Sequence, residues 1–137
     1  MHLGKHHRSV DDKGRIAMPA AFREAFADTG YIAKAPGHQC ITAYLPDDFA
    51  ATIQRLENLL REGQATQNEY RQFTSSAEEI SFDAQGRFRM PKELRDAAQI
   101  GESVVIAGVG TRIEIWNPDL WAGVETDTDS LQGERWL

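Results

Sequence analysis

Asp11-Asp12-Lys13-Gly14-Arg15-Ile16-Ala17-Met18-Pro19 is the stretch that decides the fold, because the chain repeats it with changes as Asp83-Ala84-Gln85-Gly86-Arg87-Phe88-Arg89-Met90-Pro91. The two copies lie 72 positions apart. The same offset, without a gap, relates further pairs on either side: Ser9 and Ser81, Arg23 and Arg95, Ala25 and Ala97, Ile41 and Ile113. Such repetition fixes the architecture before any element is assigned. Because a unit of about forty residues is near the lower limit for independent folding, we expect the two halves to share one core.

The local chemistry of the repeated stretch predicts a tight hairpin. Three residues separate Asp11 from Arg15, and a three-residue hairpin loop ends in a left-handed residue, for which glycine is best suited. Gly14 occupies that position, and Gly86 occupies it in the second copy. We therefore expect Asp11 and Arg15 to close the hairpin as a cross-strand ion pair, with Asp83 and Arg87 doing the same in the second copy.

Lys13 is then left at the tip of the first hairpin, pointing to solvent, whereas the second copy has Gln85 there. After the turn, apolar residues alternate with the arginines: Ile16 and Met18 share one face, and Phe88 and Met90 share the equivalent face. The strand ends at a proline in both copies, and we expect Pro19 and Pro91 to be the first residues of helices 19–26 and 91–98. Four residues of these helices should be buried: Phe22, Phe26, Leu94 and Ala98.

The rest of the chain divides around the two copies. We predict a first repeat at 1–46, a helical hairpin at 47–77, a second repeat at 78–121 and an acidic tail at 122–137. Residues 3–10 should be a strand or a pair of short strands, and strand pairs are expected at 32–34 with 41–45 and at 104–107 with 113–116. The helical insert has apolar residues at helical spacing, and Thr66 with Glu69 forms a capping box: its apolar stripe is Phe49, Ile53, Leu56 and Leu60. The predicted fold is mainly β with peripheral helices, of the α+β class.

Composition narrows the class of protein. The formal charge of −6 disfavours a general binder of nucleic acid, but residues 1–34 carry a net positive charge, and the local field is what steers a polyanion. Cys40 is the only cysteine, so there is no disulfide framework and a reducing compartment is expected. The sequence shows neither a signal peptide nor an apolar run of membrane-spanning length, which predicts a cytoplasmic protein. Because no phosphate loop, nucleophile elbow or carboxylate pair is recognisable, we expect no enzymatic activity, cofactor or small-molecule substrate.

A metal site at the N-terminus is an alternative use of three histidines, His2, His6 and His7. His6 and His7 are adjacent, so on a strand they point to opposite faces, and a fourth ligand is not evident. We therefore favour solvent-facing histidines near the basic patch and predict no metal. Cys40 lies close to His38, and the favoured interpretation is a buried or partly buried strand cysteine.

The order of Asp-x-x-Gly-Arg hairpin, apolar alternation, proline and short helix with Phe22-Arg23 or Leu94-Arg95 resembles the swapped-hairpin barrel family of AbrB and MazE. Two such units joined by a helical hairpin, with Leu3-Gly4 early and Glu114-Ile115-Trp116 late, resemble the MraZ family. The resemblance implies two tandem AbrB-like halves that form a swapped-hairpin, double-split β-barrel. It further implies a bacterial, nucleoid-associated transcriptional regulator that assembles into rings. Its partner would be double-stranded promoter DNA, at repeated elements ahead of division and cell-wall genes.

These observations lead to a hypothesis of a DNA-binding transcriptional regulator that acts as a homo-oligomer. The residues expected at DNA are Lys13 and Arg15 first, then Arg8, Gly14 and Arg87. Asp11, Asp83 and Gly86 are expected to shape and pair the hairpins, with Asp11 positioning Arg15 instead of contacting DNA. The alternative is an antitoxin-like protein-interaction module, in which the helical insert is the working surface.

Overall fold

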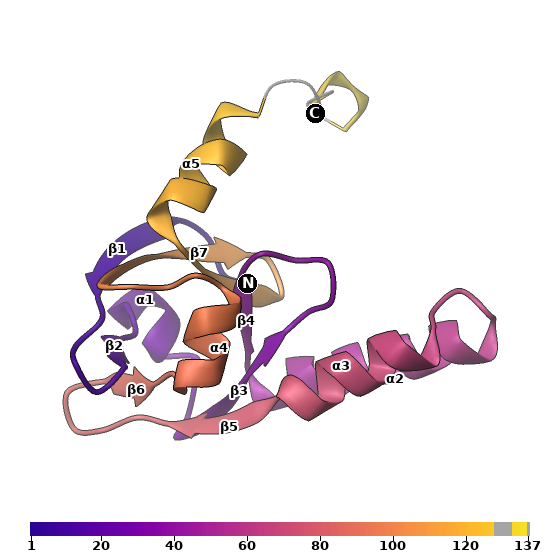
Figure 1. Cartoon of the computed structure of the whole chain (residues 1–137), viewed down its shortest axis with the longest axis horizontal. Coiled ribbons are helices and arrows are strands. Elements are labelled where there is room, and N and C mark those ends of the chain that lie inside the picture. Colours follow the sequence, from indigo (N-terminus) through magenta and orange to yellow (C-terminus); the bar gives the residue numbers. More distant parts are fainter. Residues whose placement is uncertain (128–132, 137) are drawn as a thin grey trace.

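The computed structural model describes residues 1–127 and 133–136, with the side chain of Glu134 left aside. The elements in chain order are β1 (Lys5–Ser9), β2 (Arg15–Ala17), α1 (Ala20–Arg23), β3 (Thr29–Lys34), β4 (Ile41–Tyr44), α2 (Pro46–Arg61), α3 (Gln67–Ser76), β5 (Glu78–Ser81), β6 (Arg87–Arg89), α4 (Lys92–Ala97), β7 (Ser103–Val109), β8 (Arg112–Trp116), α5 (Pro118–Thr126) and a 3₁₀ turn (Gly133–Arg135). The predicted α+β class, mainly β with helices at the periphery, is confirmed (Figure 1). None of the described helices is both long and apolar enough to span a bilayer.

The two repeats exchange strands. A six-stranded antiparallel sheet has the order β1-β7-β8-β4-β3-β5, and β2 pairs with β6 in a separate two-stranded ribbon. The 72-residue offset carries β1 onto β5, β3 onto β7 and β4 onto β8, so the sheet reads the same from both ends. An approximate two-fold axis therefore passes between Thr42 and Glu114, and between Ile16 and Phe88, which are paired residues at the repeat offset. Among the described strands no ladder joins β1 to β5, and the closed barrel stays a prediction.

The strands on either side of the Asp11–Arg15 turn pair with each other over a shorter length than a β-hairpin predicts. β1 begins at Lys5 instead of residue 3 and pairs along its length with β7 of the other repeat, while β2 pairs with β6. Beyond the turn itself, only the isolated bridge between Val10 and Ile16 joins the two arms. The strands leave the turn for partners in the other half, so the hairpins interlock the repeats. The predicted strand pairs later in each repeat are confirmed as β3 with β4 and β7 with β8.

One apolar core is built from both repeats, as predicted. Its buried members include Ile16, Met18, Phe22, Phe26, Ile32, Ile41 and Ile80 together with Phe88, Met90, Leu94, Ala98, Val104, Ile106, Ile113 and Ile115. All four residues expected to be buried are buried, but the helices are shorter than predicted: Phe22 lies in α1 and Leu94 in α4, whereas Phe26 and Ala98 lie beyond the C-terminal ends of these helices. Pro19 and Pro91 are not their first helical residues, however. With ψ at 139° and 150° both prolines are extended N-caps, and the helices begin one residue later.

The helical insert packs on the outer face of the sheet by one side only. Helices α2 and α3 run side by side and project beyond the sheet, away from the β2–β6 ribbon (Figure 1). Phe49, Ile53 and Leu56 of α2 are half-buried against a small cluster around Tyr44 and Phe73. The capping box at Thr66 is confirmed, since Thr66 and Glu69 exchange hydrogen bonds of 3.1 and 2.9 Å. Because α2 has no fully buried residue, the insert offers a large exposed surface.

The N-terminal histidines do not all face solvent, which corrects the sequence-based expectation for His2. That side chain is buried and meets the ring of Phe22 edge-on, with centroids 5.9 Å apart. Burial lowers the pKa of His2. His6 contacts the same ring at 5.3 Å, whereas His7 is exposed on the opposite face of β1, as the strand alternation predicts.

Candidate nucleic-acid interface

The β2–β6 ribbon brings the two hairpins to the same end of the molecule, opposite the helical insert (Figure 1). Ile16 and Phe88 form its central pair and are buried in the core. Because side chains alternate along a strand, the neighbouring positions all face outward. In the ladder Arg15 lies opposite Arg89, and Ala17 lies opposite Arg87. The outer face of the ribbon is therefore lined by three arginines.

Each hairpin is closed by its aspartate, as predicted. The Asp11 amide donates to the Arg15 carbonyl at 3.1 Å, and the Gly14 amide donates to the Asp11 carbonyl at 3.0 Å. The Asp11 carboxylate accepts the amides of Arg15 at 2.8 Å and Lys13 at 2.9 Å, and also Arg15 Nε at 2.7 Å. Gly14 has φ of +78°, in the left-handed region that the loop requires. A single carboxylate thus fixes both the turn and the arginine.

The second hairpin repeats this geometry. Asp83 accepts the amides of Arg87 and Gln85, both at 2.9 Å, and Arg87 Nε at 2.8 Å, and Gly86 has φ of +75°. The amide that donates from Arg15 is the largest cause of a lowered pKa at Asp11, and the amide of Arg87 has the same effect on Asp83. Both carboxylates are therefore ionised at neutral pH, so they hold their arginines as charged hydrogen-bond partners.

The ion pairs with aspartate orient the two guanidinium groups and leave terminal N–H donors available. The Nε atom of Arg15 is bonded to Asp11, while its two terminal nitrogens have no hydrogen-bond partner among residues 1–127 and 133–136. Arg87 Nη1 also reaches to 3.9 Å from Asp11 Oδ2, which links the two hairpins. Lys13 and Arg89 are exposed, and no carboxylate in the described part of the chain lies within ion-pair distance of either.

The hairpins clasp each other through their glycines. The Gly14 carbonyl accepts the Met90 amide at 2.9 Å, and the Gly86 carbonyl accepts the Met18 amide at 3.1 Å. Gly14 is buried, and its own amide is already bonded to Asp11. The amide of Gly14, a residue expected at DNA, is therefore not a free donor. Gly14 shapes the turn, and the donors left at the surface are side chains.

Two further arginines pack behind the glycines. Arg95 donates from Nε to the Met90 carbonyl at 3.0 Å and lies next to Gly14 of the other repeat. Arg23, its repeat equivalent, lies next to Gly86 with its guanidinium 4.7 Å from the ring centre of Phe82. Each repeat thus uses the arginine of its short helix to support the hairpin of the other repeat.

Comparison with known proteins identifies the family. A family model described as "MraZ protein, putative antitoxin-like" matches residues 73–132. The Transcriptional regulator MraZ of Syntrophomonas wolfei is 37% identical over 136 residues, which cover 98% of this chain and 93% of the relative. The proteins of that name from Alkaliphilus metalliredigens (34% identical; 94% of this chain, 90% of the relative) and Paenarthrobacter aurescens (36%; 97% and 99%) match comparably. The chain belongs to the MraZ family.

The resemblance indicated by the sequence motifs is thereby confirmed, and with it membership of a family of transcriptional regulators. The names of these MraZ relatives describe regulators and not enzymes.

Of the residues predicted for DNA in this MraZ chain, Lys13, Arg15 and Arg87 belong to the two hairpins that the ribbon joins. Arg8 lies half-buried on β1, and its guanidinium donates to the His7 carbonyl at 2.8 Å, which turns it back onto its own strand. Arg89 was missed as a candidate. Its alternation with Phe88 already placed it on the polar face, but its position beside Arg15 depends on the pairing of β2 with β6.

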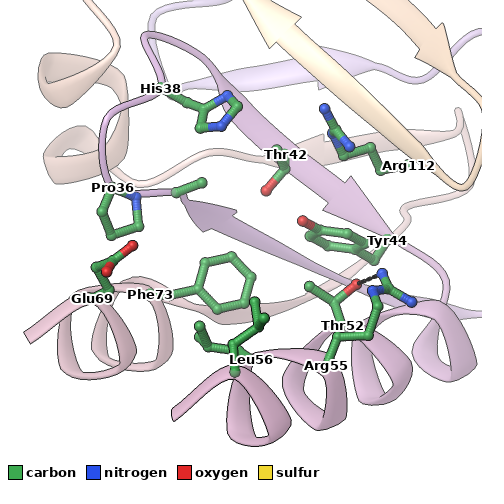
Figure 2. Close-up of a pocket in the computed structure, with 12 residues that line it drawn as sticks. Pro36, His38, Thr42, Tyr44, Thr52, Arg55, Leu56, Glu69, Phe73 and Arg112 are labelled. Carbon is green, nitrogen blue, oxygen red and sulfur yellow. Dashed lines mark hydrogen bonds between the residues drawn. The ribbon is translucent and has the colours of Figure 1, made fainter. Parts of the chain in front are cut away.

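A second concave feature of this MraZ chain lies away from the ribbon. A pocket of about 290 Å³ lies between α2, α3, the β3–β4 loop and the outer face of β4 and β8. Figure 2 shows Tyr44 and Phe73 on its apolar side, with Arg55 and Arg112 at its rim, and Arg55 donates to Thr52 at 2.9 Å. The sequence alone gave no sign of this pocket, since its walls come from two helices, two strands and the β3–β4 loop.

Proposed function

We propose that the chain binds double-stranded promoter DNA with the outer face of the β2–β6 ribbon and the tips of its two hairpins. The observation that supports this most strongly is the convergence of four basic side chains, Lys13, Arg15, Arg87 and Arg89, on one surface. Two of them, Arg15 and Arg87, are held by carboxylates through Nε, and the side chain of each stays partly exposed. A two-stranded ribbon is also one of the few elements that fit the major groove.

In this proposal the residues have different tasks. Arg15 presents paired terminal nitrogens, which suit the O6 and N7 acceptors of guanine or a phosphate. Lys13 at the exposed tip contributes a point charge toward a phosphate, which positions the protein but reads no sequence. Asp11 and Asp83 keep Arg15 and Arg87 in one orientation, so little side-chain freedom is lost on binding.

Several copies of the chain are needed for tight binding. The ribbon surface has four basic residues against three acidic ones, Asp11, Asp12 and Asp83, a net charge of only one. Such a weak local field suits a homo-oligomer whose subunits engage repeated promoter elements together, because linkage raises the effective concentration of each further contact. Following the family resemblance, we propose that the subunits form a ring-like assembly. It would bind ahead of division and cell-wall genes, including the gene for this protein, and be cytoplasmic and associated with the nucleoid.

The test is binding to the DNA upstream of the protein's own gene, measured by fluorescence anisotropy at several salt concentrations. Arg15→Ala should abolish specific binding while native mass stays unchanged. Arg61→Ala, on the far helical insert, is the matched control and should bind as wild type does. Wild-type binding should weaken steeply with salt, because each subunit displaces counterions from phosphates. An Arg15→Ala protein that binds the promoter as tightly as wild type would sink the assignment.

A second candidate function is an antitoxin-like role in which the partner is another protein. It is favoured by the exposed side of the α2–α3 insert and by the wording of the matching family model. Native mass discriminates the two functions. A large closed homo-oligomer supports the DNA regulator, whereas a dimer that gains a different protein as partner supports the antitoxin-like role.

A further inference from the structure

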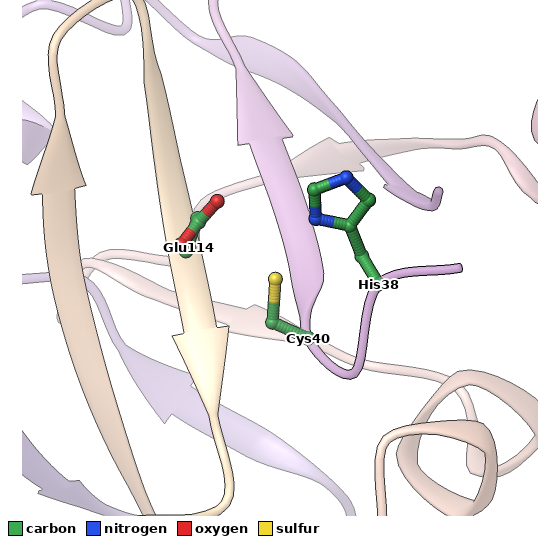
Figure 3. Close-up of side chains that lie close together, drawn as sticks. All are labelled: His38, Cys40 and Glu114. Carbon is green, nitrogen blue, oxygen red and sulfur yellow. The ribbon is translucent and has the colours of Figure 1, made fainter. Parts of the chain in front are cut away.

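Three metal-ligating side chains from both repeats converge on the outer face of the sheet. His38, in the loop between β3 and β4, Cys40 just before β4, and Glu114 in β8 have ligand atoms that all lie within 4.8 Å of one another. Figure 3 shows the Cys40 sulfur directed into the space between the His38 ring and the Glu114 carboxylate. Cys40 is fully buried and Glu114 nearly so, whereas His38 is exposed. The cluster is therefore reachable from solvent through the histidine.

The fold itself does not require these residue types. At the repeat offset, His38 corresponds to Gly110, Cys40 to Arg112, and Glu114 to Thr42. The equivalent positions of the other half, in the tighter β7–β8 turn, at the start of β8 and in β4, thus hold none of the three ligand types.

We propose that His38, Cys40 and Glu114 form a zinc site. A soft thiolate, an imidazole and a carboxylate are the ligand types that Zn²⁺ binds, at about 2.0–2.3 Å in tetrahedral sites. Three protein ligands leave the fourth position to water. On binding, the Cys40 thiol gives its proton to solvent and its sulfur binds the metal, so a zinc–sulfur bond replaces the sulfur–hydrogen bond.

The ligands can close on the ion by movement of one loop. His38 follows Gly37, which has φ of +80°, and even a Cβ added to this glycine would meet no atom within 4 Å, so the turn has room to shift. Glu114 is held from behind: Trp116 Nε1 donates to Oε1 at 3.0 Å and Arg112 Nε donates to Oε2 at 3.0 Å. Arg112 Nη2 also lies 2.9 Å from Oε2, so Oε1 is the oxygen that keeps a further lone pair for a metal. Hydrogen bonds of this kind commonly orient metal-ligating carboxylates.

Zinc at this position would tie the β3–β4 loop of the first repeat to β8 of the second, beside the approximate two-fold axis. The same loop borders the pocket under the helical insert, where His38 and Arg112 both contribute to the wall. Metal binding therefore adds a side-chain link between the two halves beside the β4–β8 ladder that already joins them.

The experiment is a titration of the full chain, prepared without a polyhistidine tag, with Co²⁺ as a spectroscopic substitute for zinc. Wild type should show a thiolate-to-cobalt charge-transfer band that Zn²⁺ abolishes by displacement. Cys40→Ser should lose the band. His38→Ala changes only an exposed loop residue and should weaken Co²⁺ binding by about tenfold to hundredfold. Circular dichroism of each variant reports that the fold is retained.

His7→Ala is the matched control, since His7 is exposed on β1 and belongs to the N-terminal histidines. It should bind Co²⁺ as wild type does. The proposal is overturned if the wild type shows no charge-transfer band, or if His38→Ala retains the wild-type affinity. It is also overturned if His7→Ala loses binding, because the ion would then lie among the N-terminal histidines.

Discussion

Replacing the hairpin glycine Gly14 with alanine should destabilise the fold far more than the same change at Gly86. Both glycines have left-handed φ, at +78° and +75°. Their surroundings differ. A Cβ on Gly14 would lie 2.8 Å from the Met90 carbonyl oxygen and 3.1 Å from the Arg95 guanidinium carbon, whereas a Cβ on Gly86 meets only Arg23 Nε at 3.7 Å. The repeat thus supplies its own control for the close approach of the two hairpins.

The magnitude follows from two contributions. An L-residue in the left-handed region costs about 1–2 kcal/mol, and the smaller conformational freedom of unfolded alanine returns about 0.4–1 kcal/mol. Both variants should therefore lose about 1 kcal/mol from conformation alone. At Gly14 the clash is with a backbone oxygen that cannot rotate away, so overpacking adds about 1–3 kcal/mol. We expect a loss of about 2–4 kcal/mol for Gly14→Ala and about 1 kcal/mol for Gly86→Ala.

The assay is equilibrium unfolding in urea at one fixed protein concentration, because assembly makes apparent stability depend on concentration. Gly37→Ala is a third variant, with φ of +80° and open space around it, and should match Gly86→Ala. The reasoning fails if Gly14→Ala and Gly86→Ala lose the same free energy of unfolding, since the hairpins would then not be in the close contact that the Met90–Gly14 hydrogen bond implies.

Three further outcomes are expected. The folded-state pKa values of Asp11 and Asp83 are lowered, so the stability that these carboxylates contribute is complete above about pH 4 and is lost as the pH falls through the lowered values. The double variant Asp11→Asn with Asp83→Asn should therefore be less stable than wild type at neutral pH and approach its stability in acid, when unfolding is measured at a series of pH values. The double variant Ala17→Arg with Arg89→Ala moves one arginine along the ribbon and keeps the total charge. It should bind the promoter more weakly than wild type, with the same dependence of affinity on salt concentration; equal affinity would show that only the total charge matters. Thr66→Ala removes the N-cap of α3 and should cost about 0.5–2 kcal/mol in urea unfolding, and an unchanged midpoint would contradict that role.

Features set by local chemistry were predictable from the sequence. The aspartate–arginine closure, the left-handed glycines and the capping box at Thr66 each depend on residues within a few positions of one another, and all are confirmed. The prolines show the limit of such rules. The fixed φ of a proline suits both an N-cap and a first helical residue, and only the extended ψ, set by the preceding strand, decides between them.

Features set by long-range pairing were not predictable. His2 is buried because the N-terminal segment passes directly over Gly108, where any Cβ would lie 2.4 Å from the Leu3 amide nitrogen. Nothing near His2 in the sequence indicates that approach. Arg89 became a candidate for DNA contact only when the structure paired β6 with β2, because a residue's neighbours across a ribbon depend on the partner strand and its register.

The ribbon register also changes how the two repeats share the proposed surface. In the sequence, the first hairpin has Lys13 at its tip where the second has Gln85, so the second copy has one positive charge fewer there. The second copy, however, has Arg89 where the first has Ala17. Since Arg89 lies opposite Arg15, its charge adds to the first hairpin and not to the second. Lys13, Arg15 and Arg89 therefore gather at one end of the ribbon, and Arg87 is left at the other. Both differences act in the same direction, so a DNA ligand would meet one mildly basic hairpin and one hairpin without net charge, despite the two-fold symmetry of the backbone.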